Sequence, residues 1–255
     1  MQWHGIAVQQ ICRLALVLSL VGAAWPASAG PFGAWAAVVV AADYRAHSGA
    51  DTEVFDNARR DLSQALIRAG FAPANLRQFS VRPGRYTELP LRTELPLIGD
   101  TLKTITQTAR GGCLFYFTSH GAPQGLVFGD HLLPPEAMAD LIDDTCAERP
   151  TVIVISACYS GVFIPALAAA NRMILTAARP DRPSFGCSED LDYTFFDQCV
   201  LEALPFSPTF PDLAVNARTC VAQREQKEGV APASEPQLFV GDRIEPLLAY
   251  YTLTP

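Results

Sequence analysis

The sequence has little positive charge and few residues that could hold a metal ion. Its 255 residues include 19 Lys and Arg against 26 Asp and Glu, a formal net charge of −7 at pH 7. No basic run or basic stripe with interleaved aromatic residues offsets this balance, which excludes nucleic acid as the expected partner, because phosphates require Lys and Arg. With only four histidines and no Cys-x-x-Cys pair, we expect neither a metal site nor another cofactor.

Long apolar runs are also absent beyond the first 29 residues, so we expect no membrane span in the mature chain. Later runs such as 114–117 and 152–155 have the length of core strands. The N-terminus instead combines Arg13, an apolar run over residues 14–24 and the small residues Ala27-Ser28-Ala29. This order is typical of a secretory signal peptide. We expect residues 1–29 to be removed, residues 30–255 to form one domain, and the protein to be secreted or periplasmic.

Six cysteines remain after the expected cleavage, in a compartment where disulfides persist. If one of them must stay free to react, at most two bridges can form. We expect one bridge between Cys199 and Cys220. The other would join Cys146 to either Cys113 or Cys187.

Strand-like and helix-like segments alternate along the whole mature chain. Predicted strands cover residues 35–42, 76–81, 113–118, 152–155, 173–176 and 237–240. Predicted helices cover residues 55–69, 97–109, 136–145, 164–170, 192–204 and 210–228. The alternation predicts a single α/β domain with three layers and a mainly parallel central sheet.

Two polar segments follow directly on two of these strands, and they contain His120 and Cys158. Ligands bind at the carboxyl ends of the strands in open parallel sheets. Cys158 lies 38 positions after His120, which allows one crossover helix, so both side chains are expected at one rim. A thiol with its ordinary pKa of about 8.5 is a weak nucleophile, and we expect the imidazole and a helix N-terminus to shift it toward thiolate.

Glycine follows each member of this pair at a place where a backbone turn is needed. The N–H groups of Gly121 and Cys158 could together hold a developing oxyanion, and Ser160 and Gly161 allow a sharp turn. Taken singly, a buried cysteine or a packed histidine is ordinary core structure. The combination favours a catalytic pair with His120 as base and Cys158 as nucleophile.

The segments Thr118-Ser119-His120-Gly121 and Ser156-Ala157-Cys158-Tyr159-Ser160-Gly161 resemble those of the legumain-like family of cysteine peptidases, the asparaginyl endopeptidases of the caspase and gingipain clan. The resemblance covers roughly residues 36–198. It implies the caspase-hemoglobinase fold, a polypeptide substrate, His120 as base, Cys158 as nucleophile and Gly121 as an oxyanion donor.

The same resemblance points to a specificity pocket and to a departure from the family pattern. Ser184 and Asp192 are similar to the pocket's serine and aspartate, with Asp190 as an alternative acid, and Arg45 is the nearby arginine. Ser156 stands where the family has an acidic residue. If Asp190 or Asp192 points into an otherwise neutral pocket, a basic or amide side chain would be favoured, because a buried carboxylate needs a donor or a cation.

These observations predict an exported cysteine endopeptidase that works through a thioester acyl-enzyme. A transamidase or peptide ligase of the same family is the nearest alternative, since an amine can replace water in resolving the thioester. A non-catalytic binding or scaffold protein with the same fold is the other, although a scaffold would have no need of both His120 and Cys158.

Overall fold

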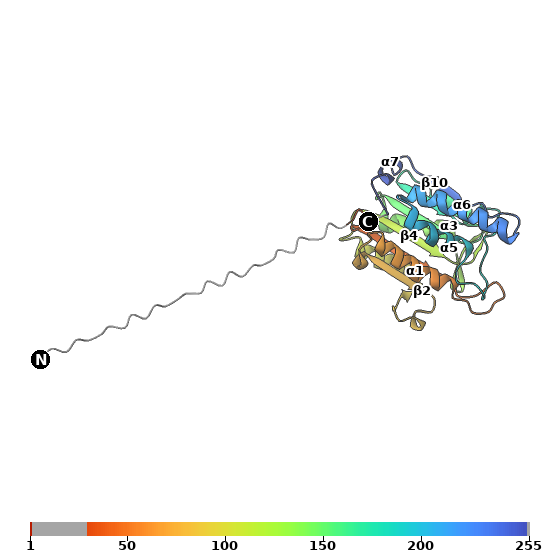
Figure 1. Cartoon of the computed structure of the whole chain (residues 1–255), viewed down its shortest axis with the longest axis horizontal. Coiled ribbons are helices and arrows are strands. Elements are labelled where there is room, and N and C mark those ends of the chain that lie inside the picture. Colours follow the sequence, from red (N-terminus) through yellow and green to blue (C-terminus); the bar gives the residue numbers. More distant parts are fainter. Residues whose placement is uncertain (2–29, 254–255) are drawn as a thin grey trace.

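A seven-stranded sheet runs through the middle of the computed structural model, which describes residues 30–253 and Met1 (Figure 1). The strand order is β10-β9-β8-β4-β1-β2-β3, and all neighbours are parallel except β10, which is antiparallel to β9. The strands are β1 (Trp35–Ala41), β2 (Leu76–Ser80), β3 (Leu91–Arg92), β4 (Gly112–Thr118), β8 (Thr151–Ser156), β9 (Arg172–Thr176) and β10 (Gln237–Val240).

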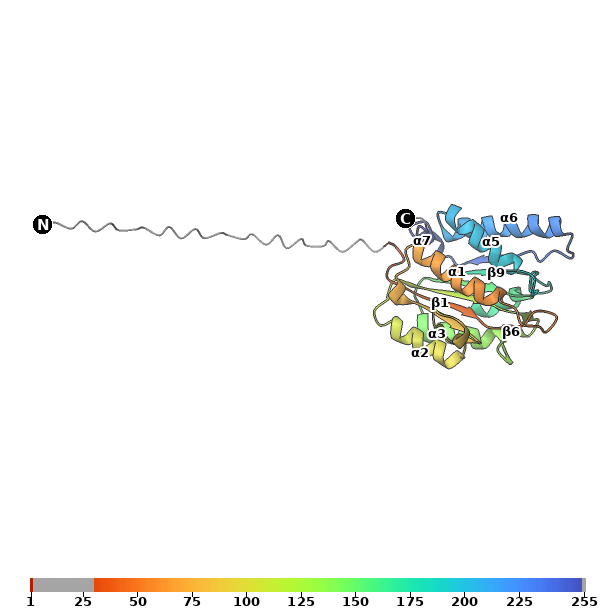
Figure 2. The ribbon, with the colours of Figure 1, turned by 60° about the horizontal axis from the view of Figure 1, so that its bottom comes forward.

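Helices cover both faces of this sheet and make three layers (Figure 2). One face carries α1 (Val54–Arg68), α5 (Phe195–Ala203), α6 (Phe210–Glu228) and the short α7 (Glu245–Leu248); the other carries α2 (Leu95–Ile105), α3 (Pro135–Cys146) and α4 (Ile164–Leu167). The predicted three-layer α/β fold with a mainly parallel sheet is confirmed. The expected signal peptide, residues 1–29, lies outside the described residues apart from Met1. Within the described part of the chain, no helix is long and apolar enough to span a membrane.

Alternate residues of the buried strands face opposite layers, as the two-residue period of a strand requires. In β1, Ala37 and Val39 belong to the core with α1, α5 and α6, whereas Ala36, Val38 and Val40 belong to the core with α2, α3 and α4. Strands buried on both faces read as continuous apolar runs, which explains why they were recognisable in the sequence.

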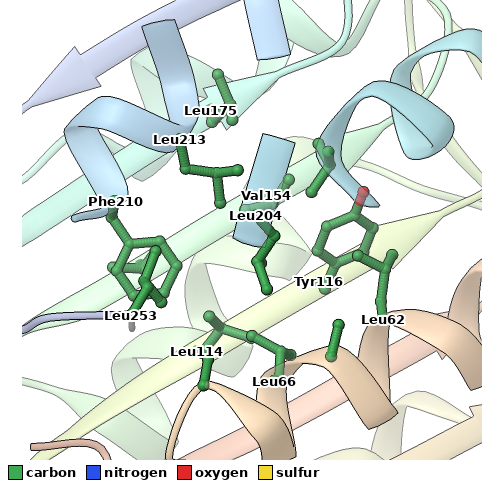
Figure 3. Packing of buried hydrophobic residues seen from close by; sticks show 14 of the residues in the cluster. Leu62, Leu66, Leu114, Tyr116, Val154, Leu175, Leu204, Phe210, Leu213 and Leu253 are labelled. Atoms are coloured by element: carbon green, nitrogen blue, oxygen red, sulfur yellow. The ribbon is translucent and has the colours of Figure 1, made fainter. Parts of the chain in front are cut away.

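Figure 3 shows the first of these cores from close by. Leu114 and Tyr116 of β4 lie between Leu62 and Leu66 of α1 and Leu213 of α6. The strand that carries the histidine segment is therefore held by helices from both halves of the chain.

A small antiparallel sheet follows β4 directly and consists of β5 (Gly121–Ala122), β6 (Gly125–Phe128) and β7 (His131–Leu133). The strands β3, β5 and β7 and the short helix α7 were missed in the sequence. Short one-turn helices lie at Pro73–Asn75, Pro83–Arg85, Ser160–Phe163 and Leu204–Phe206.

Two helix starts differ by two residues or more from the predicted ones. The helix expected at 97–109 begins at Leu95 and ends at Ile105, because Pro96 fits the first turn of a helix, where no N–H partner is needed. The helix expected at 192–204 begins at Phe195. Its start is set by Thr194, whose side chain accepts a hydrogen bond from the N–H of Asp197.

Two disulfides are present in the described part of the chain: one joins an outer layer to the sheet, and the other joins two helices of one outer layer. Cys113–Cys146 links β4 to α3, and Cys199–Cys220 links α5 to α6. Both predicted pairings are confirmed, with Cys113 as the partner of Cys146. Cys158 and Cys187 are free.

Replacing both Cys113 and Cys146 with alanine should lower the free energy of unfolding by about 4 kcal/mol, because the bridge spans 33 residues and restricts the unfolded chain. Urea unfolding followed by circular dichroism measures this. Cys187→Ala, which breaks no bridge, is the control. If the double variant unfolds at the urea concentration of the control, the bridge contributes no stability.

Candidate active site

The pairing of β4 with β8 brings His120 and Cys158 to the same rim. Thr118 pairs with Ser156 in the parallel register, and the N–H of Ser119 donates to the carbonyl of Ser156 at 3.1 Å. His120 and Cys158 each lie two residues beyond this pair. Both line one cavity of 450 Å³.

The His120 ring is held from two sides. Its Nε2 lies 2.8 Å from the carbonyl oxygen of Arg45, and its face meets the Phe55 ring edge-on with centroids 5.2 Å apart. A carbonyl can only accept a hydrogen bond, so Nε2 carries the hydrogen. The neutral imidazole therefore has its free lone pair on Nδ1, which is the atom able to take a proton.

The Cys158 sulfur is held by the backbone of one residue. The N–H of Ser184 donates to Sγ at 3.2 Å, and the thiol donates to the carbonyl of Ser184 at 3.3 Å. Burial raises the pKa of Cys158, and the backbone hydrogen bond from Ser184 opposes this only in part. The direction of this pKa shift is opposite to the expected shift toward thiolate.

The sharp turn after β8 is made by Tyr159 and not by the residues expected for it. Tyr159 has a φ of 57° in the left-handed region, and its N–H donates to the carbonyl of Arg182 at 2.8 Å. Gly161 serves close approach instead, because a Cβ there would lie 2.5 Å from the Pro180 ring. Strained backbone of this kind is commonly held at functional sites.

Gly121 lies against the backbone of Cys158. A Cβ at this position would lie 2.1 Å from the carbonyl oxygen of Cys158. The bond from the N–H of Val127 to the carbonyl of His120 makes Gly121 and Leu126 a non-hydrogen-bonded pair of the small sheet. The ladder thus leaves the Gly121 N–H available, and among the described residues no other residue accepts from the Cys158 N–H.

The residues expected to form the specificity pocket do not all meet. Ser184 lines the cavity, but Arg45 does not. The Arg45 side chain binds Asp43 at 2.9 Å and the carbonyl of Gly129 at 2.5 Å. The structure thus places this guanidinium beside the small sheet and away from the cavity wall.

The other three polar residues of the expected pocket also lie off the cavity wall. Ser156 is 1% exposed and its hydroxyl lies 3.3 Å from that of Thr194. Asp190 and Asp192 are exposed to solvent and do not line the cavity.

A buried carboxylate that was not recognised in the sequence lies beneath the site. Asp197 is fully buried and accepts hydrogen bonds from the hydroxyls of Tyr116 at 2.7 Å and Thr118 at 2.6 Å. Burial raises the pKa of this carboxyl, and the hydroxyl donors offset the rise only in part. It ties α5 to the end of β4, two residues before His120. The available sequence signal was Thr194-x-x-Asp197, a pattern that marks the start of a helix and places Asp197 in its first turn.

Part of the cavity wall escaped sequence reasoning. Leu191, Phe195 and Val230 line it together with the exposed His47. They come from three separate stretches of chain, so no local pattern identifies them. In the described part of the chain, no three His, Cys, Asp or Glu side chains gather closely enough to hold a metal ion.

Comparisons with known proteins bear on the family and the fold of this chain. The model of the peptidase C13 family, the legumain family, matches residues 59–204, more than half of the chain. Among solved structures, the crystal structure of caspase-1 from Spodoptera frugiperda is similar with a TM-score of 0.59 and 16% identity, over 83% of this chain and 88% of that one. At this identity the likeness is one of fold. The comparison with curated proteins found no match.

Alkylation of Cys158 by iodoacetamide should speed up with pH through a midpoint above about 8.5, the ordinary value for cysteine. The reason is that burial raises the pKa of this thiol, so thiolate forms only at higher pH. Mass spectrometry of peptides containing Cys158 gives the rate at each pH, with Cys158→Ala as the blank. A midpoint below about 7.5 would show that the thiolate already exists in the resting protein.

Proposed function

Since this chain belongs to the peptidase C13 family and is a cysteine-type peptidase, we propose that it hydrolyses peptide bonds with Cys158 as nucleophile and His120 as base. The observation that carries this proposal is the shared cavity: one sulfur and one imidazole, from adjacent strand ends, line the same 450 Å³ space. A nucleophile beside a base that is oriented by a third group is the usual arrangement for covalent catalysis.

In the first half of the reaction, Cys158 forms a bond to the carbonyl carbon of the substrate. The proton of the Cys158 thiol, which is hydrogen-bonded to the Ser184 carbonyl in the resting structure, passes from the sulfur to Nδ1 of His120. The hydrogen bond from Nε2 to the Arg45 carbonyl keeps the ring oriented while it is charged. The carbonyl oxygen becomes an oxyanion that the N–H groups of Gly121 and Cys158 stabilise.

In the second half, the oxyanion collapses and the bond to the leaving nitrogen breaks. The imidazolium of His120 gives its proton to that nitrogen, and the thioester of Cys158 remains. His120 then takes a proton from water as the water attacks the thioester. The carboxylic product leaves, and the proton returns to the sulfur.

We also propose that the protein is exported to an oxidising compartment. Support comes from the signal-peptide pattern of residues 1–29 in the sequence and from the two disulfides. The free cysteines Cys158 and Cys187 both line the active-site cavity.

A thiol-directed electrophile such as a peptidyl chloromethyl ketone should label Cys158, and His120→Ala should slow this labelling and peptide hydrolysis by about 10²-fold or more. His131→Ala is the matched control, because His131 is exposed and lies outside the cavity. Intact-mass measurements over time give the labelling rate. Labelling of the His120→Ala variant at the wild-type rate would show that His120 is not the base.

Gly121→Ala should reduce kcat for peptide hydrolysis by about 10²-fold to 10³-fold, the effect of losing one oxyanion donor. The added Cβ would press on the Cys158 carbonyl and displace the Gly121 N–H. Gly84→Ala, which has open space around the new methyl group, is the control. Thermal unfolding checks that both variants are folded, and a folded Gly121→Ala variant with near wild-type kcat would remove Gly121 from the oxyanion site.

A further inference from the structure

The cavity beside the nucleophile has an apolar wall. Phe185, Leu191, Phe195 and Val230 face it together with Pro183. The Phe185 and Phe195 rings lie 6.3 Å apart. The cavity's volume of 450 Å³ is within the usual range of small-ligand sites, about 300–1,000 Å³.

A small hydrophobic cluster supports this wall. Ala41, Val54 and Phe55 are fully buried, and the partly buried Cys187 and Leu191 pack against them. Phe55 also contacts the His120 ring. The apolar wall is therefore continuous with the packing that holds the catalytic imidazole.

Several backbone groups of the wall are already engaged in hydrogen bonds. The N–H of Phe195 donates to the carbonyl of Phe185, and the N–H of His47 donates to the carbonyl of Cys187, both at 3.0 Å. Both backbone groups of Ser184 are engaged with the Cys158 sulfur. Besides His120 and Cys158, the polar side chains on the wall are those of Ser184, Ser188 and His47, so a polar side chain would find few partners there.

The charged groups near the cavity are held elsewhere. Arg45 is paired with Asp43, and Asp197 is fully buried beneath hydroxyl donors. Asp190 and Asp192 are exposed and off the wall. The condition for preferring a basic or amide side chain, a carboxylate in the pocket, is therefore not met. A charged or amide group placed in this cavity would lose its hydration without a full set of partners, at a cost of about 1–3 kcal/mol.

We propose that this cavity is the primary specificity pocket and that the enzyme prefers an apolar side chain, such as Leu, Met or Phe, immediately before the scissile bond. The proposal rests on the catalytic roles of Cys158 and His120 given above. The occupant follows from continuity, because the apolar wall and the catalytic pair line one space.

The experiment uses two matched series of peptides that differ only in the residue before the reactive carbonyl: Leu, Met, Phe, Asn, Asp, Arg or Lys. One series is fluorogenic and reports kcat/KM. The other carries a chloromethyl ketone and reports the rate of Cys158 labelling, which needs no turnover. We expect the best apolar residue to exceed every polar one by at least about 10-fold in both series.

Two variants place a carboxylate in the wall. Leu191→Asp and Val230→Asp should each lower the rate with Leu and raise it with Lys or Arg, by about 10-fold or more in the ratio. Leu132→Asp is the matched control, because Leu132 is exposed in β7 and does not line the cavity. Two separate positions are used so that misfolding of one variant leaves the other informative.

The outcomes separate the two claims. Preference of the wild-type protein for Asn, Asp or a basic residue, or equal rates with all seven, would overturn the specificity proposal and leave the catalytic pair intact. An unchanged preference in a folded Leu191→Asp or Val230→Asp variant would also overturn it. Failure of every peptide to be cleaved or to label Cys158 would overturn the proposed function itself.

Discussion

The parallel pairing of β4 with β8 is the constraint on which the site depends. The match of Thr118 with Ser156 fixes where each strand ends, so His120 and Cys158 emerge at one rim. A slip of one residue would turn one side chain to the opposite face of the sheet. Both strands are buried on both faces between the two hydrophobic cores, so the packing of helices on each side sets this register. The relative position of His120 and Cys158 therefore depends on the packing of the two hydrophobic cores.

Enclosure of the site favours binding of a hydrophobic side chain but disfavours ionisation of the Cys158 thiol. The apolar wall that suits a hydrophobic side chain also removes water from Cys158, and this raises the pKa of the thiol. The resting sulfur accordingly donates to the Ser184 carbonyl. In the proposed mechanism the proton moves from the sulfur to His120, so the hydrogen bond from the thiol to the Ser184 carbonyl must first break, and we propose that substrate binding beside Ser184 breaks it. Asp197 accepts hydrogen bonds from Tyr116 and Thr118, and these hold α5, which carries Phe195 of the cavity wall, against β4.

Much of the fold was predictable because its signals are local. The central strands are continuous apolar runs, the helix over residues 210–228 has its predicted bounds, and His120 and Cys158 lie just beyond the ends of two strands. The remainder depends on contacts between distant segments. Val230 meets the loop at Phe185 only after α6 has crossed the sheet. The direction of the Cys158 pKa shift depends on how deeply the sulfur is buried, and no spacing in the sequence encodes that depth.

The most direct test of the central claim is a crystal structure of the protein with a peptidyl ketone ending in Leu, bound covalently to Cys158. We expect a bond from Sγ to the carbonyl carbon, and an oxygen within about 2.7–3.1 Å of the N–H groups of Gly121 and Cys158. We also expect the His120 ring beside the adduct and the Leu side chain against Leu191. An adduct whose oxygen points to solvent, with His120 turned away from the sulfur, would rule out the proposed catalytic arrangement.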